Sequence, residues 1–294
     1  MEQIKLKSPA KINLFLKIMG KRPDGYHDIF SWFQAVDLFD RLHFKKSKRS
    51  DFNLSIENGA DIPCDGNNLI IKTAELMFGK YGLTGGLEIR VEKNIPVAAG
   101  LAGGSSNAAA TIVALDRLFG LGLTAREMAD TGLAIGSDVP FFFSRGQAEI
   151  TGRGERIRNI ALPVDYFIVQ VTPAVSISTA ESYRRLNLGL TRSELDVKLA
   201  RCVDFTELVA RIGNIGNDFE RLQFETFPEL RETGDRLRKT GAALTRMSGS
   251  GPTIYGLYEK QPKTDILREF IGGNWHVSCT HPIILPAWDP EEIT

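Results

Sequence analysis

The chain has 294 residues, which is more than a single small hydrophobic core requires and enough for two domains with a cleft between them. Its 36 lysine and arginine residues balance 36 aspartate and glutamate residues, and the basic run at residues 45–49 is short, which argues against nucleic acid as a partner. Three isolated cysteines (Cys64, Cys202 and Cys279) are too few for a closed zinc site, and no apolar stretch is long enough for a membrane span or a signal peptide. We therefore expect a reduced, cytoplasmic protein that binds no membrane.

The first predicted element is a strand at residues 10–18. Its aliphatic side chains alternate with a second set of residues: Ile12, Leu14, Leu16 and Ile18 with Lys11, Asn13, Phe15 and Lys17. A period of two is typical of a half-buried strand. We therefore expect Lys11 and Asn13 on the face opposite the aliphatic one.

A Pro-Asp-Gly turn at residues 23–25 follows this strand and places Tyr26 and His27 on or just beyond a loop. A second strand is predicted at residues 87–91, where apolar and polar residues alternate. Lys93 lies at the end of that strand and, by the same alternation, belongs to its inward-facing positions.

Two helices and a hairpin are predicted next. In the first helix, apolar residues recur at helical spacing after a cluster of glycines and serines, and the helix ends at Gly120. The second helix begins with a capping box at residues 124–127 and ends near residue 136. Residues 147–160 are typical of a hairpin, with its turn at residues 152–154.

The pattern changes from about residue 161. Strands are predicted near residues 165–172, 243–247, 253–258 and 276, with short helices up to about residue 240 and a helix near residues 264–270. This alternation predicts an α+β protein with two domains, residues 1–160 and 161–294, of which the second resembles a split βαβ (ferredoxin-like) sandwich.

The glycine and serine cluster begins at Pro96 with the sequence PVAAGLAGGSSNAAA. It lacks the lysine of a Walker A loop and the glycine spacing of a dinucleotide-binding fingerprint. Its glycines allow close approach of the backbone to a ligand, and the helix that follows offers free N–H groups and a positive dipole end, which suit a phosphate. The alternative is an ordinary helix cap, because serine and asparagine are favoured at that position.

Four separated motifs together resemble the GHMP kinase superfamily: PAKIN at residues 9–13, the glycine and serine loop, GSDVP at 136–140 and SGSG at 248–251. The resemblance implies a two-lobed fold, with an N-terminal ATP-binding domain, a C-terminal ferredoxin-like domain and a cleft between them. In that superfamily the loop holds the phosphates of ATP, and this sequence supplies Pro96, Gly100, Leu101, Gly103, Gly104, Ser105 and Ser106. Ala102 departs from the family pattern, in which glycine is usual.

A fifth motif, RPDGYH at residues 22–27, narrows the resemblance. With this motif, the sequence is similar to the members of the superfamily that phosphorylate the 2-hydroxyl of a cytidine diphosphate-linked methylerythritol. Those members act in the non-mevalonate route to isoprenoid precursors. We then expect an ATP-dependent small-molecule kinase that uses Mg²⁺ and is a monomer or weak homodimer. Two alternatives stay open: another small-molecule kinase of the superfamily, or a non-catalytic nucleotide-sugar sensor on the same fold.

The resemblance also implies which residues carry the chemistry. Asp138 is the expected general base, and Lys11 is expected to keep that carboxylate ionised and to orient the acceptor hydroxyl. Without the resemblance, Asp138 would be the cap of a turn and Lys11 a solvated strand lysine.

The substrate residues follow from the same resemblance. Tyr26 is expected to stack on the cytosine base and His27 to bond to its edge, while Asn13 also holds the substrate. Tyr183 is the candidate for a second stacking aromatic. Without the resemblance, Tyr26 would be an aromatic residue of a turn and His27 a surface histidine. Tyr183 would be a core residue of a helix.

The remaining expected site residues belong to the nucleotide and to the second domain. Asn68 and Lys93 are expected to line the nucleotide pocket. Mg²⁺ enters with ATP and needs few protein ligands, with the Ser106 hydroxyl as one candidate contact. Ser248, Gly249 and Gly251 are expected to close over the substrate or the nucleotide phosphates, and the alternative is an ordinary turn between strands.

Overall fold

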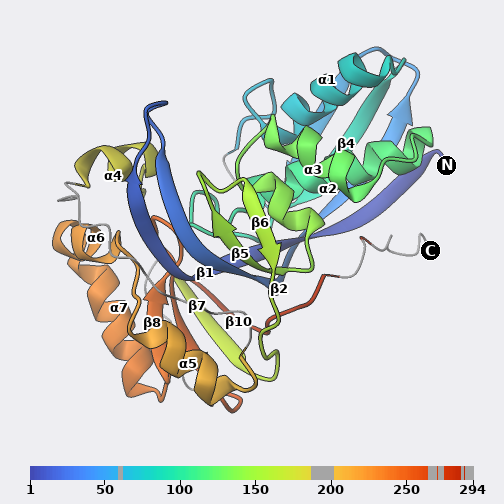
Figure 1. Ribbon diagram of the computed structural model, residues 1–294. Coiled ribbons are helices and arrows are strands. Elements are labelled where there is room, and N and C mark those ends of the chain that lie inside the picture. Colours follow the sequence, from blue (N-terminus) through green and yellow to red (C-terminus); the bar gives the residue numbers. More distant parts are fainter. Residues whose placement is uncertain (59–61, 187–201, 264–269, 271–274, 286–287, 289–294) are drawn as a thin grey trace.

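The computed structural model describes residues 1–58, 62–186, 202–263, 270, 275–285 and 288. Two sheets organise these residues, one in the N-terminal and one in the C-terminal part of the chain (Figure 1). Among the helices within the described ranges, none is long and apolar enough to cross a membrane.

The N-terminal sheet is built on a very long hairpin. Its strands are β1 (Gln3–Lys21), β2 (His27–Ser47), β3 (Phe52–Glu57), β4 (Gly86–Glu92), β5 (Gln147–Thr151) and β6 (Arg156–Asn159). The strand order is β3-β4-β2-β5-β6, and β1 pairs antiparallel with β2 beside this path. The predicted turn joins β1 to β2, and the predicted hairpin is formed by β5 and β6.

The strand predicted at residues 10–18 lies within β1, but the expectation that it is half-buried is wrong. Residues 8–16 are all buried, so both faces of the strand are covered in this region. One face packs toward α2, and the other belongs to a core cluster that includes Tyr255 and Leu257 from the C-terminal sheet. Lys11 is therefore buried although it lies opposite the aliphatic face.

The N-terminal part also contains, where the structure describes it, three helices and a short 3₁₀ helix: α1 (Leu69–Tyr81), α2 (Gly103–Phe119), α3 (Ala125–Leu133) and η1 (Val139–Phe143). The predicted capping box is present, because the Thr124 side chain accepts from the Glu127 N–H while the Glu127 carboxylate accepts from the Thr124 N–H. Gly120 ends α2 in the left-handed conformation, as its sequence predicts. α2 carries many small buried residues, which allow it to pack closely against β1 and α1.

Within the described residues, the C-terminal part has four further helices and one antiparallel sheet. Its elements are β7 (Phe167–Pro173), α4 (Thr179–Arg185), α5 (Phe205–Gly213), α6 (Glu220–Thr226), α7 (Pro228–Lys239), β8 (Leu244–Met247), β9 (Ile254–Tyr258) and β10 (Trp275–Thr280). The sheet order β10-β7-β9-β8 places the first and third strands at its centre, which is the split βαβ arrangement predicted from the sequence. The helix predicted near residues 264–270 falls mostly outside the described residues.

The two parts meet along the hairpin of β1 and β2, which Figure 1 shows as a curved ribbon of the N-terminal sheet that faces the C-terminal part. Residues of this ribbon, such as Phe15 and Trp32, share one core cluster with Tyr166 and Ile168 of the C-terminal part. The connection from β6 to β7 contains the position at which we propose the domain boundary, between residues 160 and 161. The last described residues return to the N-terminal part, where Trp288 packs against its core.

Candidate active site

A cavity of about 1070 Å³ lies where the hairpin, the glycine and serine loop and the C-terminal part meet. Its volume is at the upper end of the range for small-molecule sites, which suits two substrates side by side. The residues predicted from the sequence that line it are Lys11, Asn13, Tyr26, His27, Asn68, Lys93, Pro96, Gly100, Gly103, Gly104, Ser105, Asp138, Tyr183 and Gly249.

Lys11 lines this cavity, and its side chain is only 4% exposed. Its ammonium group donates to Asn13 Oδ1 at 2.6 Å and to the Gly100 carbonyl at 2.9 Å. It lies 4.0 Å from a carboxylate oxygen of Asp138 and over the ring of Phe33. Burial lowers the pKa of Lys11, and the charge of Asp138 opposes that shift. The alternative of a solvated strand lysine is therefore wrong.

Asp138 directly precedes η1 and faces the cavity. Within the described part of the chain, its side chain makes no hydrogen bond that caps this helix, so the capping alternative has no support. The carboxylate is 35% exposed, which leaves it open to a ligand while Lys11 lies beside it. This is a suitable arrangement for a base that accepts a proton from a bound hydroxyl.

The glycine and serine loop leads into α2 without a side-chain cap among the described residues. The capping residue is Ala102, in the left-handed conformation with φ of 55°, and the first intrahelical bond runs from the Ser106 N–H to its carbonyl. The N–H groups of residues 103–105 precede that bond and lie at the cavity, at the positive end of the helix dipole. The alternative of a serine or asparagine cap is therefore wrong, and the loop presents backbone donors to a ligand.

Ala102 occupies a conformation that glycine adopts more easily. A left-handed conformation costs a residue with a Cβ atom about 1–2 kcal/mol, so the departure from the family pattern stores a small strain at this loop. The methyl group packs partly buried against the N-terminal core, which offsets some of that cost.

Four predicted residues lie behind the cavity wall rather than on it. Leu101 is buried in the core, and its carbonyl accepts from the Lys11 backbone N–H at 3.0 Å. The Ser106 hydroxyl accepts from the Ser8 hydroxyl at 2.7 Å, and both side chains are buried. Ser248 and Gly251 belong to the turn that backs the loop. These residues therefore shape the wall from behind.

Asn68 and Lys93 line the cavity, but each side chain also has a structural partner. Asn68 caps α1 by accepting from the Ile70 N–H and donates to the Pro63 carbonyl. Lys93 forms a buried ion pair with Asp40 at 2.7 Å. Burial lowers the pKa of Lys93, and the Asp40 carboxylate opposes that shift.

An aromatic group forms the other end of the cavity. The rings of His27 and Tyr183 stack with centroids 5.0 Å apart, and Tyr183 packs edge-on against Phe219. The Tyr26 side chain is 55% exposed, and the guanidinium of Arg153 lies over its ring. Burial and the charge of Lys21 lower the pKa of His27, so its imidazole is neutral at neutral pH.

The sequence prediction missed several cavity residues. Lys21, Arg153 and Arg184 bring positive charge to the aromatic end, which suits the diphosphate of a nucleotide sugar. Asn107 lies one turn into α2 and is 4% exposed, and its Oδ1 has no hydrogen-bond partner among the described residues. An asparagine directly after a glycine and serine loop is the signal that could have identified Asn107.

The SGSG turn supports the loop from the C-terminal part. The Ser248 hydroxyl donates to the Gly100 carbonyl at 2.8 Å and accepts from the Asn13 N–H at 3.2 Å. Gly249 and Ser250 line the cavity. The turn is therefore in contact with the residues that hold Lys11, and it does more than join β8 to β9.

Comparison with known proteins shows the family to which the chain belongs. The chain matches the family models "GHMP kinases N terminal domain" over residues 68–146 and "GHMP kinases C terminal" over residues 203–276. It is 38% identical to the 4-diphosphocytidyl-2-C-methyl-D-erythritol kinase of Bacillus pumilus, over 87% of this chain and 89% of the relative. It is 37% identical to the protein of that name from Syntrophus aciditrophicus, over 95% of this chain and 99% of the relative.

Solved structures show the same relationship. A crystal structure of 4-(cytidine 5'-diphospho)-2C-methyl-D-erythritol kinase matches with a TM-score of 0.77 and 31% identity, over 95% of this chain and 99% of the other. A homoserine kinase from Cytophaga hutchinsonii matches with a TM-score of 0.73, over 99% of this chain and 98% of the other, but at 16% identity it shows the fold alone. The chain therefore belongs to the GHMP kinases and, among them, to the 4-diphosphocytidyl-2-C-methyl-D-erythritol kinase family.

Proposed function

We propose that this cavity transfers the γ-phosphoryl group of ATP to the 2-hydroxyl of 4-diphosphocytidyl-2-C-methyl-D-erythritol, giving the 2-phosphate and ADP. The observation that carries the proposal is the buried ammonium of Lys11, 4.0 Å from the Asp138 carboxylate, between a helix N-terminus and an aromatic group. A phosphate donor fits the first end and a cytidine fits the second. The family to which the chain belongs supports both assignments.

The two charged residues divide the chemistry. Asp138 accepts the proton of the acceptor hydroxyl, which makes that oxygen a better nucleophile as the phosphoryl group arrives. Lys11 holds its charge beside the carboxylate and stabilises the negative charge that the transferring group carries. Because the ammonium also binds the Gly100 carbonyl, it is fixed relative to the loop that receives the phosphates.

The phosphates of ATP bind the backbone donors of residues 103–105 at the start of α2, with the Ser105 hydroxyl beside them. Mg²⁺ fits this end of the cavity, because the unpaired Oδ1 of Asn107 is an oxygen ligand of the kind magnesium prefers, and phosphate oxygens and water would complete its coordination. The described residues contain no cluster of three or more histidine, cysteine or acidic side chains that could hold a metal by itself. When bound, the ion would neutralise part of the phosphate charge.

The cytidine end accepts the second substrate. Tyr26 offers an exposed ring face for stacking, and the neutral His27 imidazole offers a donor or an acceptor to the edge of the base. Tyr183 holds His27 in place by stacking and lies at the cavity wall, where it also reaches the substrate. Asn13 orients the acceptor group beside Lys11.

The Asp138→Asn variant tests the chemistry. Turnover should fall by roughly 10² to 10⁴, the range for removal of a general base, while ATP binding persists. Asp116→Asn is a matched control, because Asp116 accepts from the Leu123 N–H at 2.8 Å near the end of α2. Near-normal turnover of the Asp138 variant would remove this residue from the role of base.

Tyr26→Ala tests the cytidine end separately. The KM for the cytidylated substrate should rise by about 5- to 150-fold, since base stacking contributes about 1–3 kcal/mol, while the KM for ATP stays unchanged. Equal KM values for the cytidylated substrate in variant and wild type would contradict this assignment. We also propose that the enzyme works in the cytoplasm as a monomer or weak homodimer, and its three free cysteines agree with a reducing compartment.

A further inference from the structure

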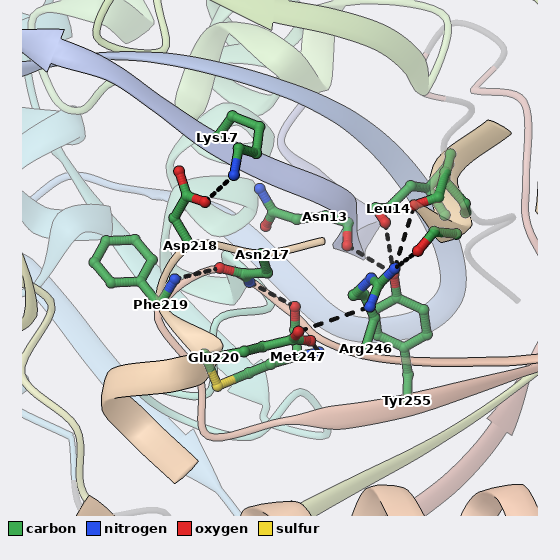
Figure 2. Close-up of polar contacts among 12 residues, drawn as sticks. Asn13, Leu14, Lys17, Asn217, Asp218, Phe219, Glu220, Arg246, Met247 and Tyr255 are labelled. Carbon is green, nitrogen blue, oxygen red and sulfur yellow. Dashed lines mark hydrogen bonds and ion pairs between the residues drawn. The ribbon is translucent and has the colours of Figure 1, made fainter. Parts of the chain in front are cut away.

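Residues 217–220, with the sequence Asn-Asp-Phe-Glu, lie immediately before and at the start of α6 and have a role that the reaction above does not assign. We call them the NDFE segment. Figure 2 shows that it contacts both the N-terminal strand β1 and the end of β8. It therefore bridges the two parts of the molecule directly behind the cavity.

Toward β1, the segment is held by backbone and side chain. The Leu16 N–H donates to the Gly216 carbonyl at 3.1 Å, and the Asp218 N–H donates to the Leu16 carbonyl at 2.9 Å. The Asp218 carboxylate accepts from the Ile18 N–H at 2.8 Å and forms an ion pair with the Lys17 ammonium. The NDFE segment is thus fixed to the strand that carries Lys11.

Toward the SGSG turn, the segment uses Asn217, which is 6% exposed. Its Nδ2 donates to the carbonyls of Met247 and Gly249, both at 2.8 Å, and its Oδ1 accepts from the Phe219 N–H. One amide therefore binds the carbonyl groups on both sides of Ser248. Glu220 provides a further hydrogen bond to the same end of β8, since its carboxylate accepts from the Met247 N–H at 2.8 Å.

Ser248 in turn is linked to Lys11 through the Gly100 carbonyl. Its hydroxyl donates to the Gly100 carbonyl at 2.8 Å, and the same carbonyl accepts from the Lys11 ammonium at 2.9 Å. The approach is close, because a Cβ atom on Gly100 would lie 2.1 Å from the Ser248 carbonyl oxygen. A displacement of the turn would therefore displace the carbonyl to which Lys11 is bound.

We propose that Asn217 is a positioning residue for Lys11, acting through Ser248 and the Gly100 carbonyl. Asp218 anchors Asn217 to β1, so that the turn and the strand keep a fixed separation. The inference rests on the proposed role of Lys11 in phosphoryl transfer. Without the amide, two buried carbonyls lose their donor, and a turn that relaxes by about 1 Å can reduce turnover by about 10²-fold.

The test is the Asn217→Ser variant. A serine hydroxyl can still accept from the Phe219 N–H ahead of α6, but it is too short to bind both carbonyls of the turn. Gln170→Ser is the matched control, because Gln170 is also a buried amide, bound to Thr280 at 2.8 Å in the C-terminal sheet. Both variants lose a buried hydrogen bond, and only the first changes the turn.

We expect Asn217→Ser to lower kcat by about 10²-fold, with the KM values for ATP and the cytidylated substrate within about threefold of wild type. The alkaline limb of its pH profile should lie at lower pH, because an ammonium that loses an acceptor is deprotonated more easily. The charged group that faces Lys11 is Asp138, and its other neighbours are the neutral Asn13 amide, the Gly100 carbonyl and the Phe33 ring. Gln170→Ser should leave both kcat and the pH profile unchanged.

A loss of kcat no larger than that of the control, or a loss without the shift of the alkaline limb, would overturn the inference. Should the serine variant fail to fold, Asn217→Asp keeps the shape and the acceptor for the Phe219 N–H, and it replaces the NH₂ group by an oxygen. Asp138→Asn separates the two hypotheses. If it retains turnover, the proposed chemistry fails, and if it is inactive while the Asn217 variants are normal, only the positioning role fails.

Discussion

Replacement of Lys11 by methionine removes one ammonium group and keeps most of the volume of the side chain. The ammonium lies 4.0 Å from the Asp138 carboxylate, where two unit charges attract by about 4 kcal/mol at an effective dielectric constant of about 20. Solvent reduces that attraction, because Asp138 is 35% exposed. For the transition state, loss of one electrostatic contact costs about 2.7–4 kcal/mol, so turnover should fall by roughly 10² to 10³.

The stability of the fold should change much less than the turnover. The buried ammonium of Lys11 is costly to desolvate, and methionine removes that cost while it leaves Asn13 Oδ1 without its donor. These effects oppose each other, so the midpoint of thermal unfolding should stay within about 4 °C of wild type.

The assay is release of ADP from ATP and the cytidylated substrate, measured beside thermal unfolding. Lys45→Met is the control, because Lys45 lies on β2 in an exposed pair with Glu88 at 3.5 Å. A Lys11→Met enzyme with turnover within about threefold of wild type would refute the electrostatic role. A large drop in the unfolding midpoint would show that Lys11 acts mainly in folding.

Three further predictions follow from the same contacts. Turnover of the wild-type enzyme should fall as pH rises through the pKa of Lys11, because deprotonation removes the charge of the ammonium group. Burial places that pKa below 10.5, so a flat kcat profile up to pH 10.5 would contradict the prediction. Gly100→Ala should destabilise the fold by about 2–4 kcal/mol in urea unfolding, since φ is 75° and the new methyl would lie 2.1 Å from the Ser248 carbonyl oxygen; unchanged stability would show that the turn yields freely. Asp40→Ala should cost about 3–5 kcal/mol in the same measurement, because Lys93 then stays buried without its partner, and a loss below about 1 kcal/mol would speak against that pairing.

Local patterns in the sequence predicted several elements correctly. The glycine cluster followed by apolar residues at helical spacing predicted α2, and the capping box predicted α3, because both signals depend on neighbours within a few residues. The split βαβ character of the C-terminal part also followed from the alternation of strands and helices. By contrast, β2, β3 and α1 were not predicted, although Asn68 before an apolar run is a signal for the start of α1.

Burial and long-range contacts could not be predicted from the same patterns. Alternation placed Lys11 correctly on β1, but its burial depends on a loop about 90 residues away and on the second sheet, so the strand pattern alone left open the alternative of a solvated lysine. The contact between Asn217 and Met247 joins segments 30 residues apart, and that between Lys17 and Asp218 joins segments 201 residues apart. The local periodicity of residue types in the sequence does not indicate such pairs. The stacking of His27 on Tyr183 is of the same kind.

The central claim is that one cavity joins a phosphate donor to a cytidylated acceptor. Release of ADP should be compared for three acceptors at equal ATP: 4-diphosphocytidyl-2-C-methyl-D-erythritol, mevalonate and homoserine. The geometry of Lys11, Asp138 and the aromatic group with Tyr26 predicts rapid release with the first acceptor and background rates with the other two. Background release with the cytidylated acceptor, or faster release with mevalonate or homoserine, would contradict the account.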